Sequence, residues 1–167
     1  MSLERPVLVL GYGNTLRGDD GAGPKLVEDV TALGLAGVRT LTCDLLTPEL
    51  AEPVSQAATV IFVDAAVDAP HKVRLRPVRP AASSQVMAHA CDPGTILALA
   101  RDVFGKEPTA WWLTIPAHFM GLGDQLSASA QRECGVALQR LKKLLSENSS
   151  TCRRTAPGRK TAPAGPR

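Results

Sequence analysis

The sequence lacks the long apolar run that export or membrane insertion would require. The first apolar stretch, residues 7–10, is short and leads directly into a glycine-rich segment, so neither a signal peptide nor a transmembrane helix is expected. Hydrophobic residues at 44% and charged residues at 21% are ordinary for a globular protein. A chain of 167 residues is long enough for one domain with a sizeable core and too short for two of ordinary size. We therefore expect one soluble domain.

The sequence also lacks paired cysteines and a serine-nucleophile motif. Its cysteines, Cys43, Cys91, Cys134 and Cys152, are far apart and form no CxxC pair. This spacing favours reduced thiols in the cytoplasm over a zinc site or a disulfide framework. Cys134 is expected in a helix core, whereas Cys43 and Cys91 stay open. There is no GxSxG motif, and a nucleophile pair of Cys91 with His118 would require the fold to bring them together.

Nucleotide-binding motifs are incomplete in the glycine-rich loop of residues 11–23. A GxGxxG loop would need glycine at position 16, where this chain has Leu16, and no Gly-Lys-Ser/Thr segment follows. Asp19 and Asp20 stand just before the expected helix, and their charge opposes a phosphate at a helix amino terminus. The loop therefore suits a cation better than a nucleotide.

The positive charge of the chain is concentrated at its end. The formal net charge is +3, but residues 151–167 carry +5 and no acidic residue, which leaves about −2 for residues 1–150. This last segment is rich in proline and has almost nothing large to bury, so we expect a disordered basic tail after a domain spanning residues 1–150. The tail could contact a partner or nucleic acid weakly, but no nucleic-acid function is expected for the domain.

Strand-like and helix-like patterns alternate along the chain. Strands are expected over residues 7–10, 38–43, 59–63, 73–77 and 111–115, the fourth as an edge strand. Helices are expected near residues 24–33, 48–55 and 93–105, and from Ser127 onward. This alternation predicts an α/β fold: a single three-layer domain whose mostly parallel sheet carries helices on both faces. In such sheets, functional sites gather at the carboxyl ends of the strands.

Three candidate site residues should meet at that edge of the sheet. Asp20 lies in the first loop, Asp64 ends the third expected strand, and His89 lies in a serine-rich segment. Taken singly, Asp19 and Asp20 could cap a helix, although one aspartate is enough for that. Together, two carboxylates and an imidazole form an incomplete ligand set for a borderline divalent metal, with positions left open for substrate or water.

Three segments carry a resemblance to a known family. GYGNTLRGDDGAG after a short apolar strand, then VIFVDAA, then AHACDPGTILALA resemble, in this order, the hydrogenase maturation endopeptidases. The resemblance covers about residues 6–147 and implies a five-stranded twisted sheet sandwiched by helices. It further implies removal of a carboxyl-terminal extension from the large subunit of [NiFe]-hydrogenase after nickel has been installed.

The resemblance also implies roles for the candidate residues. Asp20 corresponds to the metal-contacting acid, which is glutamate in some members, Asp64 to the second carboxylate and His89 to the histidine, with Asp19 as a structural neighbour. Nickel already seated in the precursor would complete its coordination with these residues. The enzyme would then be a monomer whose partner is the precursor, without a nucleotide cofactor. Water activated by the metal and a carboxylate, Asp20 or Asp64, acting as general base both stay open.

Two other functions remain compatible with the sequence. A nucleotide-binding oxidoreductase or regulator would fit the strand, GxG and helix order, with Asp44 near the end of the second strand as a possible ribose-binding acid. A non-catalytic maturation chaperone or adaptor would recognise the same precursor without cutting it. Nucleotide binding would favour the first alternative, and a stable complex with intact precursor would favour the second.

Overall fold

The computed structural model describes residues 6–67, 72–82 and 91–154, with side chains described as far as residue 147. Five strands form one sheet in the order β2-β1-β3-β5-β4, in which only β4 runs antiparallel to its neighbour. The strands are β1 (Val7–Tyr12), β2 (Val38–Cys43), β3 (Thr59–Ala66), β4 (Arg74–Val78) and β5 (Thr109–Pro116). The predicted α/β fold with a mostly parallel, five-stranded sheet is confirmed.

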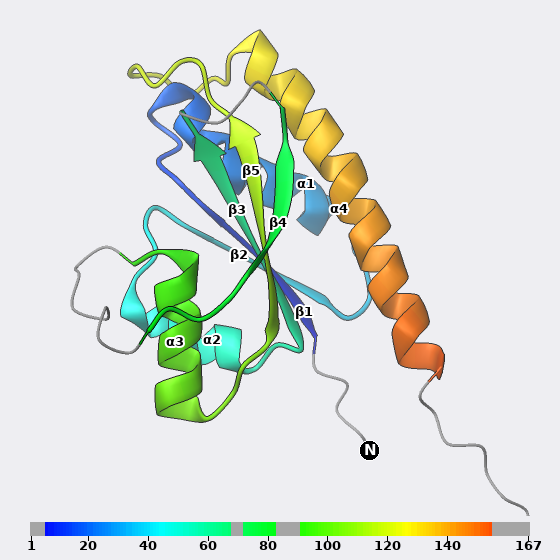
Figure 1. The fold of residues 1–167 in the computed structure, drawn as a ribbon. Coiled ribbons are helices and arrows are strands. Elements are labelled where there is room, and N and C mark those ends of the chain that lie inside the picture. The colour runs from blue at the N-terminus through cyan, green and yellow to red at the C-terminus, as the bar shows by residue number, and fades with distance from the viewer. Residues whose placement is uncertain (1–5, 68–71, 83–90, 155–167) are drawn as a thin grey trace, which may run out of the picture.

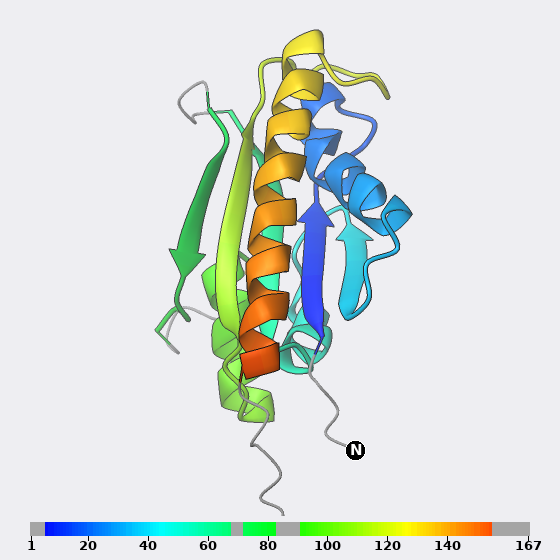
Figure 2. The same cartoon turned by 90° about the vertical axis from the view of Figure 1, so that its right-hand side faces the viewer.

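Helices cover both faces of this sheet. The helices are α1 (Ala22–Ala32), α2 (Ala51–Ser55), α3 (Pro93–Phe104) and α4 (Ala128–Arg154), with short 3-10 turns η1 (Gly18–Gly21) and η2 (Pro48–Leu50). Helices α1 and α4 pack on one face, and α2 and α3 on the other (Figures 1 and 2). No helix in the described part of the chain is both long and apolar enough to span a membrane.

The core consists of two apolar layers separated by the sheet. Ile61 and Val63 of β3 belong to the layer under α1 and α4, whereas Val60 and Phe62 belong to the layer under α2 and α3. All four side chains are buried, because successive residues of a strand point to opposite faces. This confirms the prediction that the third strand is central and buried on both faces.

The strand β1 and the helix α1 approach each other closely where glycine leaves room. A Cβ atom on Gly11 would lie 2.5 Å from the carbonyl oxygen of Gly23, and one on Gly23 would lie 2.7 Å from the carbonyl oxygen of Tyr12. Any side chain at either position would therefore force the helix away from the strand. This close approach fixes where the first loop leaves the sheet.

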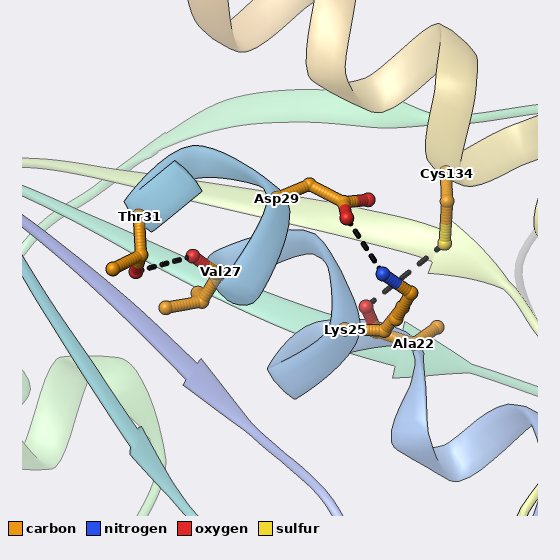
Figure 3. A network of polar contacts seen from close by, with 6 residues as sticks. All are labelled: Ala22, Lys25, Val27, Asp29, Thr31 and Cys134. Atoms are coloured by element: carbon orange, nitrogen blue, oxygen red, sulfur yellow. Dashed lines mark hydrogen bonds and ion pairs between the residues drawn. The ribbon is translucent and has the colours of Figure 1, made fainter. Parts of the chain in front are cut away.

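The helix α4 packs across α1 through a buried cysteine. The Sγ atom of Cys134 lies 4.0 Å from the carbonyl oxygen of Ala22, and α1 carries an exposed ion pair between Lys25 and Asp29 at 2.6 Å (Figure 3). Cys134 is only 6% exposed and belongs to the core, as predicted. A thiol is small and weakly polar, so it fits this helix contact without needing a strong hydrogen bond.

Some element boundaries differ from those predicted. The strand β3 continues past Asp64 to Ala66 because β5 pairs beside it as far as Ala66 and Pro116, so Asp64 lies inside the strand and does not end it. Helix α4 runs through residue 150 to Arg154, so the predicted domain boundary falls within a helix. Residues 155–167, the rest of the predicted tail, lie outside the described residues.

Candidate functional site

The carboxyl ends of β1 and β3 bring Tyr12 and Asp64 together. The strands are adjacent and parallel, with Gly11 opposite Val63, so residues 12 and 64 are neighbours at the next position. Asp64 shares a sheet face with Phe62 two residues earlier, which is the face covered by α2 and α3. Tyr12 packs against the same layer. Both side chains are half-buried at the end of this core.

The carboxyl group of Asp64 has a raised pKa. Burial raises the pKa of its carboxyl group to about 6, a hydrogen bond from the Tyr12 hydroxyl opposes that rise, and the negative charge of Asp20 adds to it. Burial also raises the pKa of Tyr12, and the charge of Asp64 adds to that effect. Tyr12 therefore stays protonated and donates to Asp64. A carboxylate with a pKa near 6 can exchange a proton near neutral pH.

The first loop holds the side chain of Asp20 through a backbone contact. Its Oδ2 accepts a hydrogen bond of 2.9 Å from the backbone N–H of Asn14. A Cβ atom at Gly13, where φ is +139°, would collide with the carbonyl oxygen of Asp20, so the loop can fold back on η1 only with glycine there. The charge of Asp20 acts on Asp64, which places the two predicted carboxylates close to each other.

Asp19 has a different role from its neighbour. The side chain is fully buried, with 0% exposure, and it accepts backbone hydrogen bonds from His118 at 2.8 Å, Phe119 at 2.9 Å and Ser127 at 2.7 Å. The Ser127 hydroxyl donates a fourth bond of 2.8 Å. Neither Asp19 nor Asp20 caps α1, whose N-cap residue is Gly21. The helix-capping interpretation of this pair was therefore wrong.

These hydrogen bonds determine the charge of Asp19. Burial alone would raise its pKa, but the three backbone donors and the Ser127 hydroxyl together hold the pKa below the ordinary value for aspartate. Asp19 is thus an anion inside the protein, satisfied by four donors. Sequence reasoning missed this contact because its partners lie 99 to 108 positions away.

Main-chain bonds join the same two loops. Gly18 N–H donates to Gly123 at 2.8 Å, Gly123 N–H donates to Leu16 at 2.9 Å, and Asp19 N–H donates to Phe119 at 2.7 Å. The first loop and the loop between β5 and α4 consequently lie side by side beyond the carboxyl ends of the strands (Figures 1 and 2). Asp20 therefore belongs to a surface made of two joined loops, the first loop and the loop between β5 and α4. We call these two loops the platform.

The predicted histidine cannot be placed relative to the carboxylates, since His89 lies outside the described residues. Asp20 and Asp64 supply oxygen donors that suit a divalent metal. The described residues form no group of three or more histidine, cysteine and acidic side chains able to hold a metal. The described pair would therefore need further ligands from elsewhere, such as a substrate.

The cysteine alternative has little chemical support. Burial raises the pKa of the Cys91 thiol, and the charge of Asp92 raises it further, which lowers the fraction of reactive thiolate. Cys91 packs against the layer under α2 and α3, and its backbone N–H is bonded to Leu46. These features favour a structural thiol over a nucleophile at Cys91.

The first loop is also unsuited to a phosphate. The N–H of Asn14, which lies where a dinucleotide loop would offer backbone donors, is already bonded to the Asp20 carboxylate. A phosphate would have to replace that carboxylate beside Asp64, against the repulsion of its charge. Asp44, the possible ribose-binding acid, is exposed after β2. The geometry therefore favours a cation over a nucleotide.

Comparison with known proteins gives matches of structure. Neither a protein-family model nor a curated protein matches the sequence. The hydrogenase maturating endopeptidase HybD from E. coli is 21% identical with a TM-score of 0.67, covering 86% of this chain and 93% of that chain. The [NiFe] hydrogenase maturation protease HybD from Thermococcus kodakarensis is 24% identical with a TM-score of 0.63, covering 83% and 98%.

A third similar structure is the hydrogenase 2 maturation peptidase from a Thaumarchaeota archaeon. It is 19% identical with a TM-score of 0.60, covering 84% of this chain and 97% of that chain. Each of these proteins is matched over nearly its whole length, so the likeness extends well beyond the strand-and-loop unit around Asp20. The chain has the fold of the hydrogenase maturation proteases.

Proposed function

We propose that this protein is an endopeptidase that removes the carboxyl-terminal extension of a [NiFe]-hydrogenase large-subunit precursor after nickel insertion. The observation that carries the proposal is the meeting of Asp20 and Asp64 at the carboxyl edge of a fold shared with hydrogenase maturation proteases. We further propose that the protein acts as a monomer in the cytoplasm, with the precursor as its partner and without a nucleotide cofactor.

Nickel enters this proposal as part of the substrate. Asp20 and Asp64 together present negative charge at the edge of the sheet, and Asp64 ionises near neutral pH. We propose that both carboxylates, with His89, contact nickel held by the precursor. Docking then depends on whether the metal has been installed, because without it the negative charges of the two carboxylates have no compensating cation.

Peptide hydrolysis needs a water to add to the scissile carbonyl carbon while the carbon–nitrogen bond breaks and the departing nitrogen gains a proton. A bound metal can supply the polarised carbonyl and the activated water. The carboxylate of Asp64, with a pKa of about 6, can instead accept the proton from water and return it to the nitrogen. Tyr12 positions Asp64 for either role through its hydrogen bond.

The proposal is tested by mass spectrometry of a large-subunit precursor incubated with the purified protein, with and without nickel. The expected result is loss of the extension from the nickel-loaded precursor alone. An unchanged mass in the presence of nickel, under conditions where an extract containing an active maturation protease shortens the same sample, would refute the peptidase. A stable complex with intact precursor would support the non-catalytic chaperone instead.

A further inference from the structure

The platform beside Asp20 carries three large apolar side chains that face solvent. Leu16 of the first loop is 60% exposed, and Phe119 and Leu122 of the loop between β5 and α4 are 49% and 91% exposed. We call these three residues the apolar lip. Leu122 is almost completely accessible, although exposing a leucine side chain to water gives up the free energy that its burial would provide.

The exposure of the lip is fixed by the backbone beneath it. The carbonyl of Leu16 accepts from Gly123 N–H, and the carbonyl of Phe119 accepts from Asp19 N–H. The Phe119 ring lies directly over two glycines, since a Cβ atom would be 2.6 Å from the ring at Gly18 and 2.5 Å from it at Gly121. The Phe119 part of the lip is therefore tied to the contacts that hold Asp19.

The lip and Asp20 lie on the same pair of hydrogen-bonded loops. Leu16 and Asp20 lie in the same short loop, and the N–H of Asn14 between the strand and Leu16 is bonded to the Asp20 side chain. A molecule that contacts Asp20 from solvent thus meets exposed apolar side chains beside the Asp20 carboxylate. This combination suits a ligand with an apolar part next to a positively charged centre.

We propose that the apolar lip is the docking surface for apolar side chains of the large-subunit precursor, next to its nickel centre. The inference rests on the proposed function and adds the residues that recognise the polypeptide around the metal. In this proposal the carboxylates contact the nickel ion, and the lip binds the precursor polypeptide that carries it. Both contacts are held in register by Asp19, which ties the two loops together.

Charge argues against a second copy of this chain as the occupant. A copy seated on the lip would bring its own Asp20 and Asp64 toward those of the first molecule, and like charges at short range are unfavourable. The nickel-bearing precursor instead supplies the opposite charge. A lip-dependent homodimer would therefore contradict the proposal, and analytical ultracentrifugation of the wild type and Leu122→Ser distinguishes the two occupants.

The test compares Leu122→Ser with Val103→Ser. Val103 is 66% exposed near the end of α3, so its substitution removes a similarly exposed apolar side chain away from the lip. Calorimetry with the nickel-loaded precursor should show a Kd raised roughly tenfold by Leu122→Ser and unchanged by Val103→Ser. In processing assays the loss should appear in KM more than in kcat. Equal Kd values for both variants would overturn the docking surface.

Binding and cleavage are measured separately, so the two proposals can fail independently. If the wild type binds precursor through the lip and never shortens it, the docking surface stands and the peptidase fails. If Leu122→Ser shortens limiting precursor as fast as the wild type, the peptidase stands and the docking surface fails. If the wild type neither binds nor cuts, both are wrong. Circular dichroism and thermal unfolding verify that each variant is folded.

Discussion

The carboxylate of Asp19 holds Ser127, which lies 108 positions further along the chain, by two hydrogen bonds. Oδ1 accepts from the backbone N–H at 2.7 Å and Oδ2 from the hydroxyl at 2.8 Å. The Ser127 oxygen in turn accepts from Ala130 N–H at 3.1 Å, in the first turn of α4. A single buried anion thus connects the loop that carries Asp20 to the start of the last helix.

Asp19→Asn should destabilise the protein. The amide keeps the shape of the carboxylate but replaces one acceptor oxygen by a donor that faces N–H groups, so buried donors lose their partner. We expect a loss of about 2–4 kcal/mol in the free energy of unfolding, measured by urea denaturation at neutral pH. Asp124→Asn is the matched control, because Asp124 is exposed in the neighbouring loop. A loss below about 0.5 kcal/mol would contradict the assigned role.

The same contact should make stability depend on acid. The pKa of Asp19 is lower in the folded protein than in the unfolded chain, so its contribution is present above the unfolded value and is lost as pH falls through the folded value. Wild-type protein should therefore lose more stability than Asp19→Asn between pH 5 and strongly acidic pH. Urea midpoints of both proteins measured across this range test the prediction. If the midpoints of wild type and Asp19→Asn fell by the same amount, the prediction would be wrong.

In metal-free protein, Asp64 should affect the pH dependence of stability in the direction opposite to Asp19, and Asp64→Asn tests this. The folded pKa of Asp64 is raised to about 6, so its stabilising contribution is complete below the unfolded value and is lost as pH rises through 6. The neutral amide avoids this loss, and its stability relative to wild type should increase from pH 4 to pH 8 by roughly 1–3 kcal/mol. Thermal unfolding at several pH values measures it. Asp44→Asn, at an exposed carboxyl group after β2, is the matched substitution.

Tyr12→Phe should raise the pKa of Asp64 further. The hydroxyl of Tyr12 donates to the carboxylate and favours its charged form, so its removal leaves burial and the charge of Asp20 less opposed. Carbon-detected NMR titration of the Asp64 carboxyl group should show a midpoint above that of the wild type. A midpoint that is unchanged or lower would contradict the assigned effect of the hydrogen bond.

Gly18→Ala should damage the platform through both strain and collision. Gly18 has a φ of +55°, and an added Cβ atom would lie 2.6 Å from the ring and from the carbonyl oxygen of Phe119. Gly37 also has a positive φ, +75°, but open space around it, so Gly37→Ala measures strain alone. We expect about 1 kcal/mol for Gly37→Ala and about 2–4 kcal/mol for Gly18→Ala, measured by chemical denaturation. Equal losses would exclude the collision with Phe119.

Asp20→Asn and His89→Ala should both abolish processing of the nickel-loaded precursor while leaving the protein folded. Asp20 is half-buried, and its carboxylate accepts a hydrogen bond from Asn14 N–H that an amide oxygen can also accept, so the expected change in stability is small and the change in activity is large. Mass spectrometry of the precursor and circular dichroism of each variant test this. Normal processing by both variants would reject the site assignment.

Local patterning was sufficient to predict the layers of the fold. The unbroken apolar run of residues 60–63 identified a strand buried on both faces, and the spacing of Leu26, Val27 and Val30 identified the apolar side of α1. Periodicity of this kind reports which side chains must leave water. It also predicted that Asp20 and Asp64 lie at one edge, since parallel strands share their carboxyl ends.

Contacts between segments far apart in the sequence could not be predicted from such local patterns. The extension of β3 past Asp64 depends on how far β5 pairs beside it, and a strand's length is decided by its neighbour as well as by its own residues. Tyr12 drew no attention in the sequence, because its role depends on the register of β1 with β3. The apolar lip could be identified only once the structure showed which apolar side chains stay exposed after folding.

The Asp19–Asp20 pair shows most clearly which features the sequence determined and which the tertiary structure decided. The sequence by itself determined that two carboxylates follow the first strand in a glycine-rich loop, and hence that a cation is favoured over a phosphate there. Only the tertiary structure decided that Asp19 is buried against the loop before α4, whereas Asp20 accepts a hydrogen bond from Asn14 N–H and its charge acts on Asp64. The physical reason is that adjacent residues have the same local propensities, whereas the donors that stabilise a buried anion come from a segment about a hundred positions away.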